Sequence, residues 1–308
     1  MLTSPHISIL IPTYNDVCVD LVKSLHHQAV SLPNLSFEVL VGDDGSTDMA
    51  MVSANRTLEA LPHCRVLRRE TNIGRAAIRN FLAREARGEW LLFADSHMSV
   101  VRDNYLSTYL SCLGDALLYG GYALPTEGPR GSLRYLYELS CIKGQEVEVR
   151  SRAPHARFHT CNFIVRREVM LAHPLDERFR RYGYEDVLFG KTLESAGVDI
   201  KHVDNPLGFN RFEPNERFMK KTEEGLQTLY SFREELTDYS RMLAVCRRLK
   251  ALHLSWLFRG IHRLAGTRIR HLLTGNHPSV FWFKVYRLGY FLDLYRRGQG
   301  EIGSYRKS

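Results

Sequence analysis

Short apolar runs alternate with amphipathic segments through the first hundred residues of the chain. Four runs, nearly all apolar, fit strands buried on both faces: residues 7–12, 37–41, 64–67 and 90–94. Between them, two segments carry apolar side chains at helical spacing: residues 16–30 and 74–87. Thr47-Asp48 is typical of a further helix start. Strands and helices in this order predict right-handed crossovers, and therefore an α/β fold with a mostly parallel sheet.

After residue 102 the pattern is looser. It predicts strands at residues 117–122, 161–165 and 198–203, and helices at residues 134–143, 167–173 and 185–197. Residues 151–159 are basic and irregular, and only helical patterning follows residue 215. We therefore expect a sheet-containing domain over residues 1–214 and a helical extension over residues 215–308.

Polar clusters stand where three of the predicted strands end. They are Thr13-Tyr14-Asn15-Asp16, Asp43-Asp44 and Asp95-Ser96-His97. In an open parallel sheet, ligands bind beyond the carboxyl ends of the strands. We expect these three turns to meet in one crevice.

Two of the polar segments suit a nucleotide diphosphate. Asp44 lies in a Gly-flanked turn, where its carboxylate could accept hydrogen bonds from a base or from sugar hydroxyls. Asn72-Ile73-Gly74-Arg75, with Arg79 one helical turn later, places an amide and guanidinium groups at a helix start. Taken singly, each also fits an ordinary turn or helix cap with solvated arginines.

Asp95-Ser96-His97 follows a buried strand, where an acidic side chain needs a partner. Asp95 and His97 stand two residues apart on a turn, so both could reach one divalent ion. A carboxylate suits Mg²⁺ or Mn²⁺, and the imidazole favours Mn²⁺. A surface turn without a metal is the alternative.

Glu185-Asp186 forms a second acidic site, at the start of a predicted helix. One of these carboxylates could take a proton from an acceptor hydroxyl. Acidic residues are also favoured at helix N-termini for electrostatic reasons alone.

Five segments, in order, resemble the motifs of family 2 glycosyltransferases. They are residues 7–15 (ISILIPTYN), 38–48 (EVLVGDDGSTD), 72–80 (NIGRAAIRN), 91–97 (LLFADSH) and 176–190 (DERFRRYGYEDVLFG). The resemblance implies the GT-A fold, a nucleotide-sugar donor that is usually UDP-linked, and inversion at the anomeric carbon. It runs from about residue 7 to residue 213.

The resemblance also implies roles for individual residues. Asp186 would be the general base, with Glu185 holding the acceptor or bracing the loop. Asp95 and His97 would ligate the divalent metal. The nucleotide-sugar would be bound by Pro12, Thr13, Tyr14, Asn15, Asp44, Asn72, Gly74, Arg75, Arg79, Asp95 and Ser96.

At two positions the chain departs from the common pattern of the family. His97 stands where most members have Asp, although the Asp-x-His form also occurs in polypeptide N-acetylgalactosaminyltransferases. A further His ligand often follows the Glu-Asp pair, but residues 205–213 hold none, and Phe209 stands in that stretch. His202 is the nearest candidate, and we expect it to be structural. The metal would then have two protein ligands, completed by the diphosphate and water.

The cysteine content, the N-terminal sequence and the lengths of the apolar stretches indicate the cellular compartment of the protein. Its six cysteines show no C-x-x-C pair, which indicates reduced, buried thiols. The N-terminus lacks the pattern of a signal peptide, and no apolar stretch reaches the roughly 18 residues needed to span a bilayer. We expect a cytoplasmic protein, with peripheral binding at the inner face of the cell membrane as an option.

The positive charge is concentrated in the C-terminal third. Residues 215–308 carry 18 Lys and Arg against 8 Asp and Glu, whereas the whole chain has a net charge of +8. Basic side chains are interleaved with Leu, Trp, Phe and Tyr over residues 239–297, a composition that suits an anionic membrane surface. A helical subdomain packed on the catalytic domain is the alternative. No nucleic-acid-binding motif is present, so we expect no nucleic-acid partner.

The sequence thus favours a glycosyltransferase that acts on a glycan or lipid-linked acceptor in surface polysaccharide synthesis. Two other functions stay open. One is an inactive nucleotide-sugar-binding or scaffold protein. The other is a nucleotidyltransferase, although the Gly-rich N-terminal phosphate loop expected of that class is absent.

Overall fold

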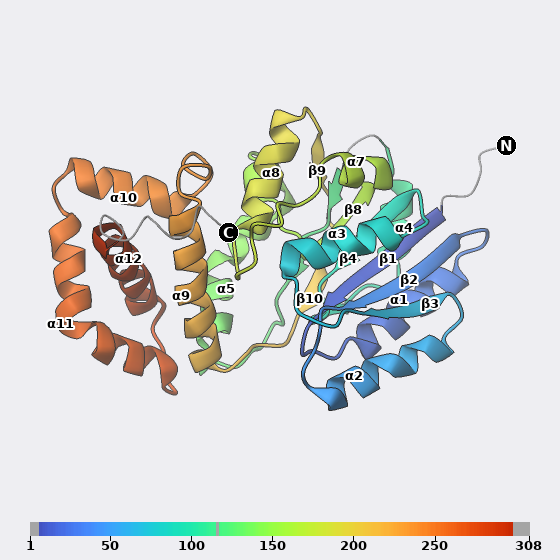
Figure 1. The fold of residues 1–308 in the computed structure, drawn as a ribbon, viewed down its shortest axis with the longest axis horizontal. Helices are drawn as coiled ribbons and strands as arrows, with labels where there is room; N and C mark the ends of the chain where they lie inside the picture. The colour runs from blue at the N-terminus through green and yellow to red at the C-terminus, as the bar shows by residue number, and fades with distance from the viewer. Residues whose placement is uncertain (1–5, 115–116, 298–308) are drawn as a thin grey trace. The chain divides into compact units, whose positions relative to one another are not determined.

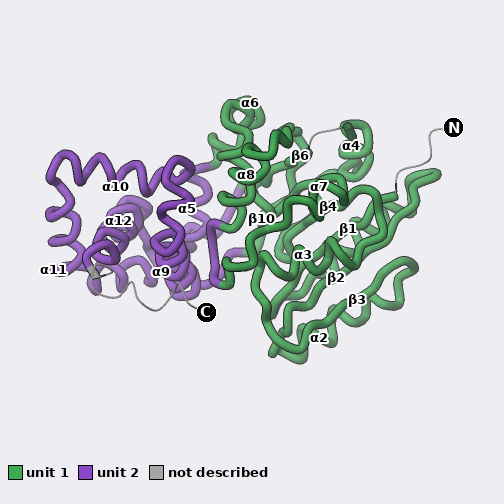
Figure 2. The backbone as a smooth tube through the Cα atoms, turned by 45° about the horizontal axis from the view of Figure 1, so that its top comes forward, with its two compact units in different colours: residues 1–126, 142–180, 185–211 green, residues 127–141, 181–184, 212–308 purple. Residues whose placement is uncertain are grey.

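The fold is given by a computed structural model that describes residues 6–114 and 117–297. The chain forms two compact units, coloured separately in Figure 2. The first comprises residues 1–126, 142–180 and 185–211, and the second comprises residues 127–141, 181–184 and 212–308. The second unit therefore takes two short segments from within the first two-thirds of the sequence.

A seven-stranded, mostly parallel sheet is the centre of the first unit (Figure 1). Its strand order is β3-β2-β1-β4-β8-β6-β9. The strands are β1 (His6–Thr13), β2 (Ser36–Asp43), β3 (Cys64–Arg68), β4 (Trp90–Ala94), β6 (Leu117–Tyr119), β8 (Asn162–Arg166) and β9 (Ile200–His202). Strands β1 to β4 are mutually parallel, and β8 runs antiparallel to both β4 and β6. The predicted fold class is confirmed.

Helices cover the sheet because its strands are apolar on both faces. One face packs its Leu10, Leu40 and Phe93 against Leu82 of α3 and Phe189 of α8. The helices of this unit are α1 (Val19–Ser31), α2 (Met49–Arg56), α3 (Arg75–Glu85), α4 (Tyr105–Ser111), α6 (Val147–Arg150), α7 (Arg167–Ala172) and α8 (Glu185–Ser195). Short 3₁₀ helices occur at Thr57–Ala60, Ile142–Gln145 and His155–Arg157. This core fixes the carboxyl ends of β1, β2 and β4 beside one another.

Asp48 caps α2 as the sequence predicted, since its carboxylate accepts from the backbone N–H groups of Ala50 and Met51. By contrast, α1 begins at Val19 rather than at Asp16. The Asp16 side chain is used elsewhere, accepting hydrogen bonds from the Val17 N–H and the Ser96 hydroxyl.

The strand predicted over residues 117–122 is in fact two strands in different sheets. β6 belongs to the main sheet, whereas β7 (Tyr122–Ala123) joins a three-stranded sheet of order β5-β10-β7. The break falls at Gly120-Gly121, where Gly121 has a φ of +78°. β5 (Met98–Val100) and β10 (Leu207–Phe209) were not predicted, because three residues are too few to show a period.

The second unit is helical, as the pattern predicted. It contains α5 (Leu133–Cys141), α9 (Asn215–Ser231), α10 (Arg241–Ala251), α11 (Ser255–Thr274) and α12 (Val280–Arg297). Its core includes Leu133, Phe218, Leu273 and Phe283, so the unit has an apolar centre of its own. No helix of the described chain is both long enough and apolar enough to cross a membrane.

Candidate active site

The turns after β1 and β2 are joined through Asn15. Its backbone lies in the left-handed region with a φ of 47°, which Asn tolerates better than most residues. Its side-chain oxygen accepts from the backbone N–H groups of Thr47 and Asp48, at 2.8 and 3.0 Å. Its own N–H donates to the Ser46 hydroxyl. Asn15 therefore holds two of the predicted polar turns together.

Asp44 organises the loop that leads into α3. Its two carboxylate oxygens accept from the backbone N–H groups of Ile73 and Gly74, at 2.8 and 3.0 Å. Its own N–H donates to the carbonyl of Thr13. The residue is 3% exposed, and burial raises the pKa of its carboxyl even though both hydrogen bonds act to lower it. Asp44 thus fixes the Ile73–Gly74 backbone, a role that the sequence did not reveal.

Gly74 immediately precedes α3 in a conformation that other residues rarely adopt, with a φ of +95°. A Cβ at this position would lie 3.2 Å from both the Cα and the carbonyl oxygen of Arg180. Glycine therefore lets the start of α3 approach the segment before Glu185 closely.

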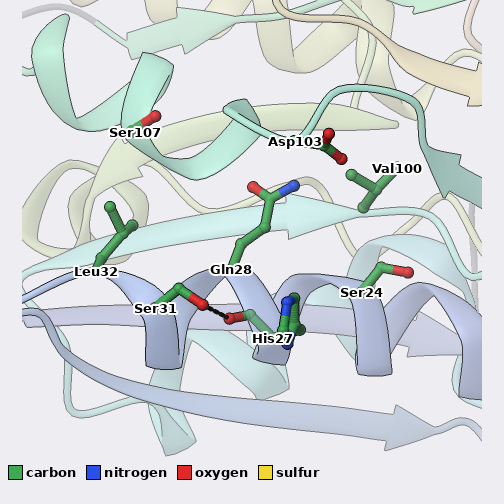
Figure 3. A pocket seen from close by; sticks show the side chains of 8 residues that line it. All are labelled: Ser24, His27, Gln28, Ser31, Leu32, Val100, Asp103 and Ser107. Carbon is green, nitrogen blue, oxygen red and sulfur yellow. Dashed lines mark hydrogen bonds between the residues drawn. The ribbon is translucent and has the colours of Figure 1, made fainter.

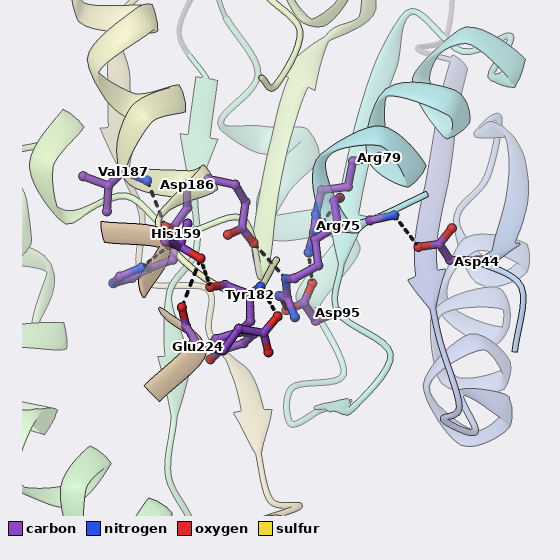
Figure 4. A network of polar contacts seen from close by, with 12 residues as sticks. Asp44, Arg75, Arg79, Asp95, His159, Tyr182, Asp186, Val187 and Glu224 are labelled. Carbon is purple, nitrogen blue, oxygen red and sulfur yellow. Dashed lines mark hydrogen bonds and ion pairs between the residues drawn. The ribbon is translucent and has the colours of Figure 1, made fainter. Parts of the chain in front are cut away.

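Two arginines of α3 hold Asp95 at the end of β4 (Figure 4). Arg79, whose side chain is 2% exposed, pairs with one carboxylate oxygen, and Arg75 lies 3.3 Å from the other. Burial alone would raise the pKa of Asp95, but the two guanidiniums outweigh it and hold that pKa below its usual range. Arg75 also donates to Glu185 at 2.8 Å, so it links the carboxylate after β4 to the first turn of α8.

Asp16 stands in the predicted polar turn after β1 but was given no individual role, and Arg211 was not predicted at all. The Ser96 hydroxyl donates to Asp16 at 2.7 Å. The Arg211 guanidinium contacts the Asp16 carboxylate at 3.0 Å and donates to the Ser96 carbonyl. Asp16 and Arg211 are 195 positions apart, so no local sequence pattern could reveal their contact. They tie the turn after β1 to the turn after β4.

His97 packs against Phe209 of β10, with ring centroids 5.2 Å apart and an edge-on orientation. Met98 of β5 is paired with Phe209 across the small sheet, which brings the two rings together. Phe209, an apolar side chain, therefore lies beside the candidate metal ligand.

The carboxylate of Asp95 and the imidazole of His97 are suitable ligands for a divalent ion, but they make up only part of a ligand set. Each Asp95 oxygen accepts one guanidinium and keeps lone-pair capacity for a further contact. Among the described residues, no three His, Cys, Asp or Glu side chains gather into a metal-binding group. The remaining ligands would have to come from substrate and water.

The two acidic residues at the start of α8 have different surroundings. Glu185 is 5% exposed; its Oε1 accepts from Arg75, whereas its buried Oε2 has no hydrogen-bond partner among the described residues. Asp186 has a side chain that is 20% exposed, and its Oδ2 lies 2.8 Å from Nδ1 of His159. Its Oδ1 accepts from the Val187 N–H.

The pKa of Asp186 is lowered. Burial opposes this, but the hydrogen bond and charge of His159, the Val187 N–H and the charge of Arg75 outweigh it. Asp186 is therefore a carboxylate at neutral pH, able to accept a proton. His159 was not predicted, because it lies in the irregular segment before β8.

His202 has the structural environment expected of it. It is 6% exposed, its Nε2 donates to the Pro154 carbonyl, and its Nδ1 accepts from Arg150. Burial lowers its pKa to about 4, so the ring is neutral near pH 7.

The remaining predicted residues lie around this network. Pro12 and Thr13 are the last residues of β1, and Tyr14 is 42% exposed just beyond them. Asn72 is exposed beside the loop that Asp44 holds. Their roles toward a nucleotide-sugar stay predictions.

A pocket of about 320 Å³ lies elsewhere in the first unit (Figure 3). It is lined by Ser24, His27, Gln28, Ser31, Leu32, Val100, Asp103 and Ser107. None of the predicted site residues contributes to it. Several predicted site residues lie instead in the polar network of Figure 4.

Residues 8–111 match Glycosyl transferase family 2, a range that includes Asp44, Arg75, Asp95 and His97. Residues 8–111 thus carry the sequence pattern of a family 2 glycosyltransferase domain. This confirms the resemblance carried by the sequence motifs, and it favours glycosyl over nucleotidyl transfer.

Two curated relatives are similar to the chain over less than a third of its length. An uncharacterized glycosyltransferase of Haemophilus influenzae is 37% identical over 91 residues, which are 29% of this chain and 28% of the relative. Poly(ribitol-phosphate) beta-N-acetylglucosaminyltransferase TarS of Staphylococcus aureus is 37% identical over 92 residues, which are 29% of this chain and 16% of TarS. The chain thus matches less than a third of the length of either relative.

Solved structures extend the similarity of fold to nearly the whole chain. Residues 1–349 of TarS in complex with UDP-GlcNAc align with a TM-score of 0.52 at 18% identity, covering 95% of this chain and 92% of that one. Mannosyltransferase PcManGT of Pyrobaculum calidifontis, in complex with GDP-Man and Mn²⁺, aligns with a TM-score of 0.59 at 14% identity, covering 98% and 88%. The fold is the GT-A fold with a helical C-terminal region.

Proposed function

We propose that this chain transfers a sugar from a nucleotide-sugar, UDP-linked, to a hydroxyl of a glycan or lipid-linked acceptor in surface polysaccharide synthesis. The observation that carries the proposal is the set of contacts around Arg75. Its guanidinium joins Asp95, at the end of β4, to Glu185, at the start of α8. Arg75 and Asp95, which lie within the range that matches family 2, are thus connected to the acidic pair at the start of α8.

Binding of the donor is assigned to the turns at the carboxyl ends of the strands. Asp44 fixes the Ile73–Gly74 backbone, and Arg75, with 39% of its side chain exposed, is accessible to a diphosphate. A guanidinium at a helix start is suited to phosphate oxygens. Holding the donor sugar and the acceptor hydroxyl in the correct relative position would supply a large part of the rate enhancement.

Asp186 is the proposed general base. The acceptor O–H bond breaks as its oxygen forms a bond to C1 of the donor sugar, and the proton passes to the Asp186 carboxylate. In the same step the bond from C1 to the diphosphate breaks, so that C1 is inverted. Glu185, with its unpaired Oε2, is proposed to accept a hydrogen bond from a hydroxyl of the acceptor or to brace the loop.

A divalent ion, Mn²⁺ or Mg²⁺, is proposed to be held by Asp95 and His97 together with diphosphate oxygens. When bound, such an ion neutralises charge on the departing diphosphate. Support comes from the carboxylate and imidazole on one turn and from the Mn²⁺ in the PcManGT structure. Because Asp95 is already paired with two arginines, we expect weak binding of the ion without nucleotide.

The surface of the second unit is proposed to bind an anionic membrane. Residues 239–297 hold 12 Lys and Arg against one acidic residue, Asp293. Several large apolar side chains here are exposed, including Leu264 at 88%, Phe281 at 66% and Trp256 at 64%. Basic helices that expose aromatic and leucine side chains suit the headgroup region of anionic lipids. Such binding would place the enzyme at the inner face of the cell membrane, next to lipid-linked acceptors.

Donor binding is tested by thermal unfolding and calorimetry with UDP, GDP, UDP-GlcNAc and GDP-mannose, each with and without Mn²⁺. A ligand at 100 times its Kd adds about 2.7 kcal/mol to stability. We expect UDP and a UDP-sugar to stabilise the protein more than their GDP counterparts. Stabilisation by GDP compounds alone would replace the UDP assignment, and no stabilisation by any of them would contradict nucleotide-sugar binding.

Membrane binding is tested by flotation of the full chain with vesicles of neutral lipid and of neutral lipid mixed with phosphatidylserine. We expect recovery with the anionic vesicles only, and a loss of that recovery in Trp256→Ser/Leu264→Ser/Phe281→Ser. A matched control, Val30→Ser, alters a side chain of α1 that is 62% exposed. Equal recovery with both kinds of vesicle, or no effect of the triple substitution, would contradict the proposal.

A further inference from the structure

The contact between His159 and Asp186 connects the irregular segment before β8 to the first turn of α8 (Figure 4). Nδ1 of His159 lies 2.8 Å from Oδ2 of Asp186. An ionised carboxylate only accepts hydrogen bonds, so Nδ1 carries the proton in this contact whether the ring is neutral or charged. The carboxylate therefore receives one donor on each oxygen, since Oδ1 accepts the Val187 N–H.

We propose that His159 is a positioning residue, which fixes the orientation of the Asp186 carboxylate through the contact between Nδ1 and Oδ2. This inference rests on the proposed function, because it presupposes that Asp186 is the general base. A carboxylate held on both oxygens keeps lone pairs in defined directions, and an incoming hydroxyl can reach only those. Misplacement of a reacting group by about 1 Å can cost about 100-fold in rate.

The position of His159 is itself well supported. Its ring lies edge-on to Tyr119 of β6, with centroids 6.2 Å apart. Phe158, the preceding residue, is 1% exposed in the main core, so the backbone at this point is anchored. A rigid support for the residue that orients a catalytic group is a general requirement of precise sites.

The other charged and titratable groups around His159 and Asp186 do not change their protonation state near neutral pH. Arg75 stays charged throughout. His202 is held neutral by burial, with a pKa of about 4. Burial raises the pKa values of Cys161 and Tyr119, so both stay protonated. Glu185, next to Asp186, is paired with Arg75 and is unchanged in every variant proposed below.

Loss of His159 should act on the base in a defined direction. His159 lowers the pKa of Asp186, so its removal raises that pKa. A base works only when deprotonated, so the fall of activity at low pH should begin at a higher pH. The affinity for the donor should not change, since His159 is hydrogen-bonded to Asp186, which is not one of the proposed donor-binding residues.

The experiment compares His159→Ala, His159→Asn and the wild type. Asn retains a side-chain N–H donor in place of Nδ1, but it cannot carry a charge. We measure kcat and KM from about pH 3 to about pH 9, a range that includes the acidic limb expected of a carboxylate with a lowered pKa, with donor affinity by calorimetry and thermal unfolding as checks on folding. His27→Ala, which alters an exposed residue of α1, is the matched control.

We expect His159→Ala to lower kcat about 100-fold, with its acidic limb moved to higher pH and donor affinity unchanged. His159→Asn should recover about tenfold of that loss, because it restores a donor to Oδ2. A folded His159→Ala with the wild-type pH profile and kcat within twofold would overturn the inference. If the wild type itself shows no transfer while it binds donor, the proposed function fails instead, and the two failures are thereby distinguished.

Discussion

Arg79 of α3 and Asp95 at the end of β4 form an ion pair that is almost entirely shielded from water. Their side chains are 2% and 9% exposed, respectively. Removing one partner of such a pair leaves an uncompensated buried charge. The pair therefore links the stability of the fold to the integrity of the proposed donor site.

Arg79→Ala should lower the free energy of unfolding by about 3 kcal/mol, because it removes the buried partner of the Asp95 carboxylate and leaves only the partly exposed Arg75 beside it. Urea unfolding followed by circular dichroism measures this loss. The matched control is Arg84→Ala on the same helix, where the side chain is 55% exposed. It should stay within about 0.5 kcal/mol of the wild type. Equal effects of the two substitutions would contradict the role given to the buried pair.

Asp44→Asn should weaken nucleotide binding about tenfold. An amide has one acceptor oxygen instead of two, so the N–H of either Ile73 or Gly74 loses its partner and the loop loosens. Calorimetry with UDP gives the affinity directly. Asp48→Asn is the control, since Asp48 caps α2 and Asn is an equally good cap. An unchanged UDP affinity in Asp44→Asn would contradict the role of Asp44 in nucleotide binding.

Gly74→Ala should cost more stability than Gly197→Ala, although both glycines have positive φ, at +95° and +71°. The backbone conformation alone costs roughly 1–2 kcal/mol for a residue with a Cβ. At Gly197 the added Cβ meets no atom within 4 Å, whereas at Gly74 it lies 3.2 Å from Arg180. The difference in unfolding free energy between the two variants therefore measures the cost of the close approach between position 74 and Arg180. A larger loss of stability in Gly197→Ala would contradict this cost.

The metal should bind chiefly together with the nucleotide. Titration of Mn²⁺ into the free protein should give weak binding, and titration in the presence of UDP should give clearly tighter binding, because the diphosphate supplies the missing ligands. His97→Ala should abolish that enhancement while leaving the binding of UDP alone unchanged. Tight Mn²⁺ binding to the free protein, or an enhancement that survives in His97→Ala, would contradict the proposed ligand set.

Much of the fold could be predicted from the sequence because its signals are local. β4 was predicted to the residue, since five consecutive apolar positions after Gly88-Glu89 are typical of a buried strand. Asp48 was recognisable as a helix cap from its position alone. The strands that were missed or merged, β5, β7 and β10, have two or three residues each, too few for a period to appear, and the seven-residue helix α4 was also not predicted.

The contacts within the site were harder to predict from the sequence. Asp44 and Asp95 were named from their positions at strand ends, but the sequence could not reveal that backbone amides hold the first and that arginines hold the second. His159 reaches Asp186 across 27 positions, from a segment that lacks any periodicity. Such pairs form only when the tertiary fold brings distant segments together.

The central claim is that the chain transfers sugar with Asp186 as the base, and one comparison tests it most directly. Release of nucleoside diphosphate from a panel of nucleotide-sugars, with Mn²⁺ and candidate acceptors, is measured for the wild type and for Asp186→Asn. We predict turnover by the wild type and a loss of about 100-fold or more in Asp186→Asn, with donor affinity preserved. Equal turnover by the two proteins would contradict the role of Asp186. Nucleotide binding without turnover by either protein would contradict the claim of an enzyme and favour a nucleotide-sugar-binding protein.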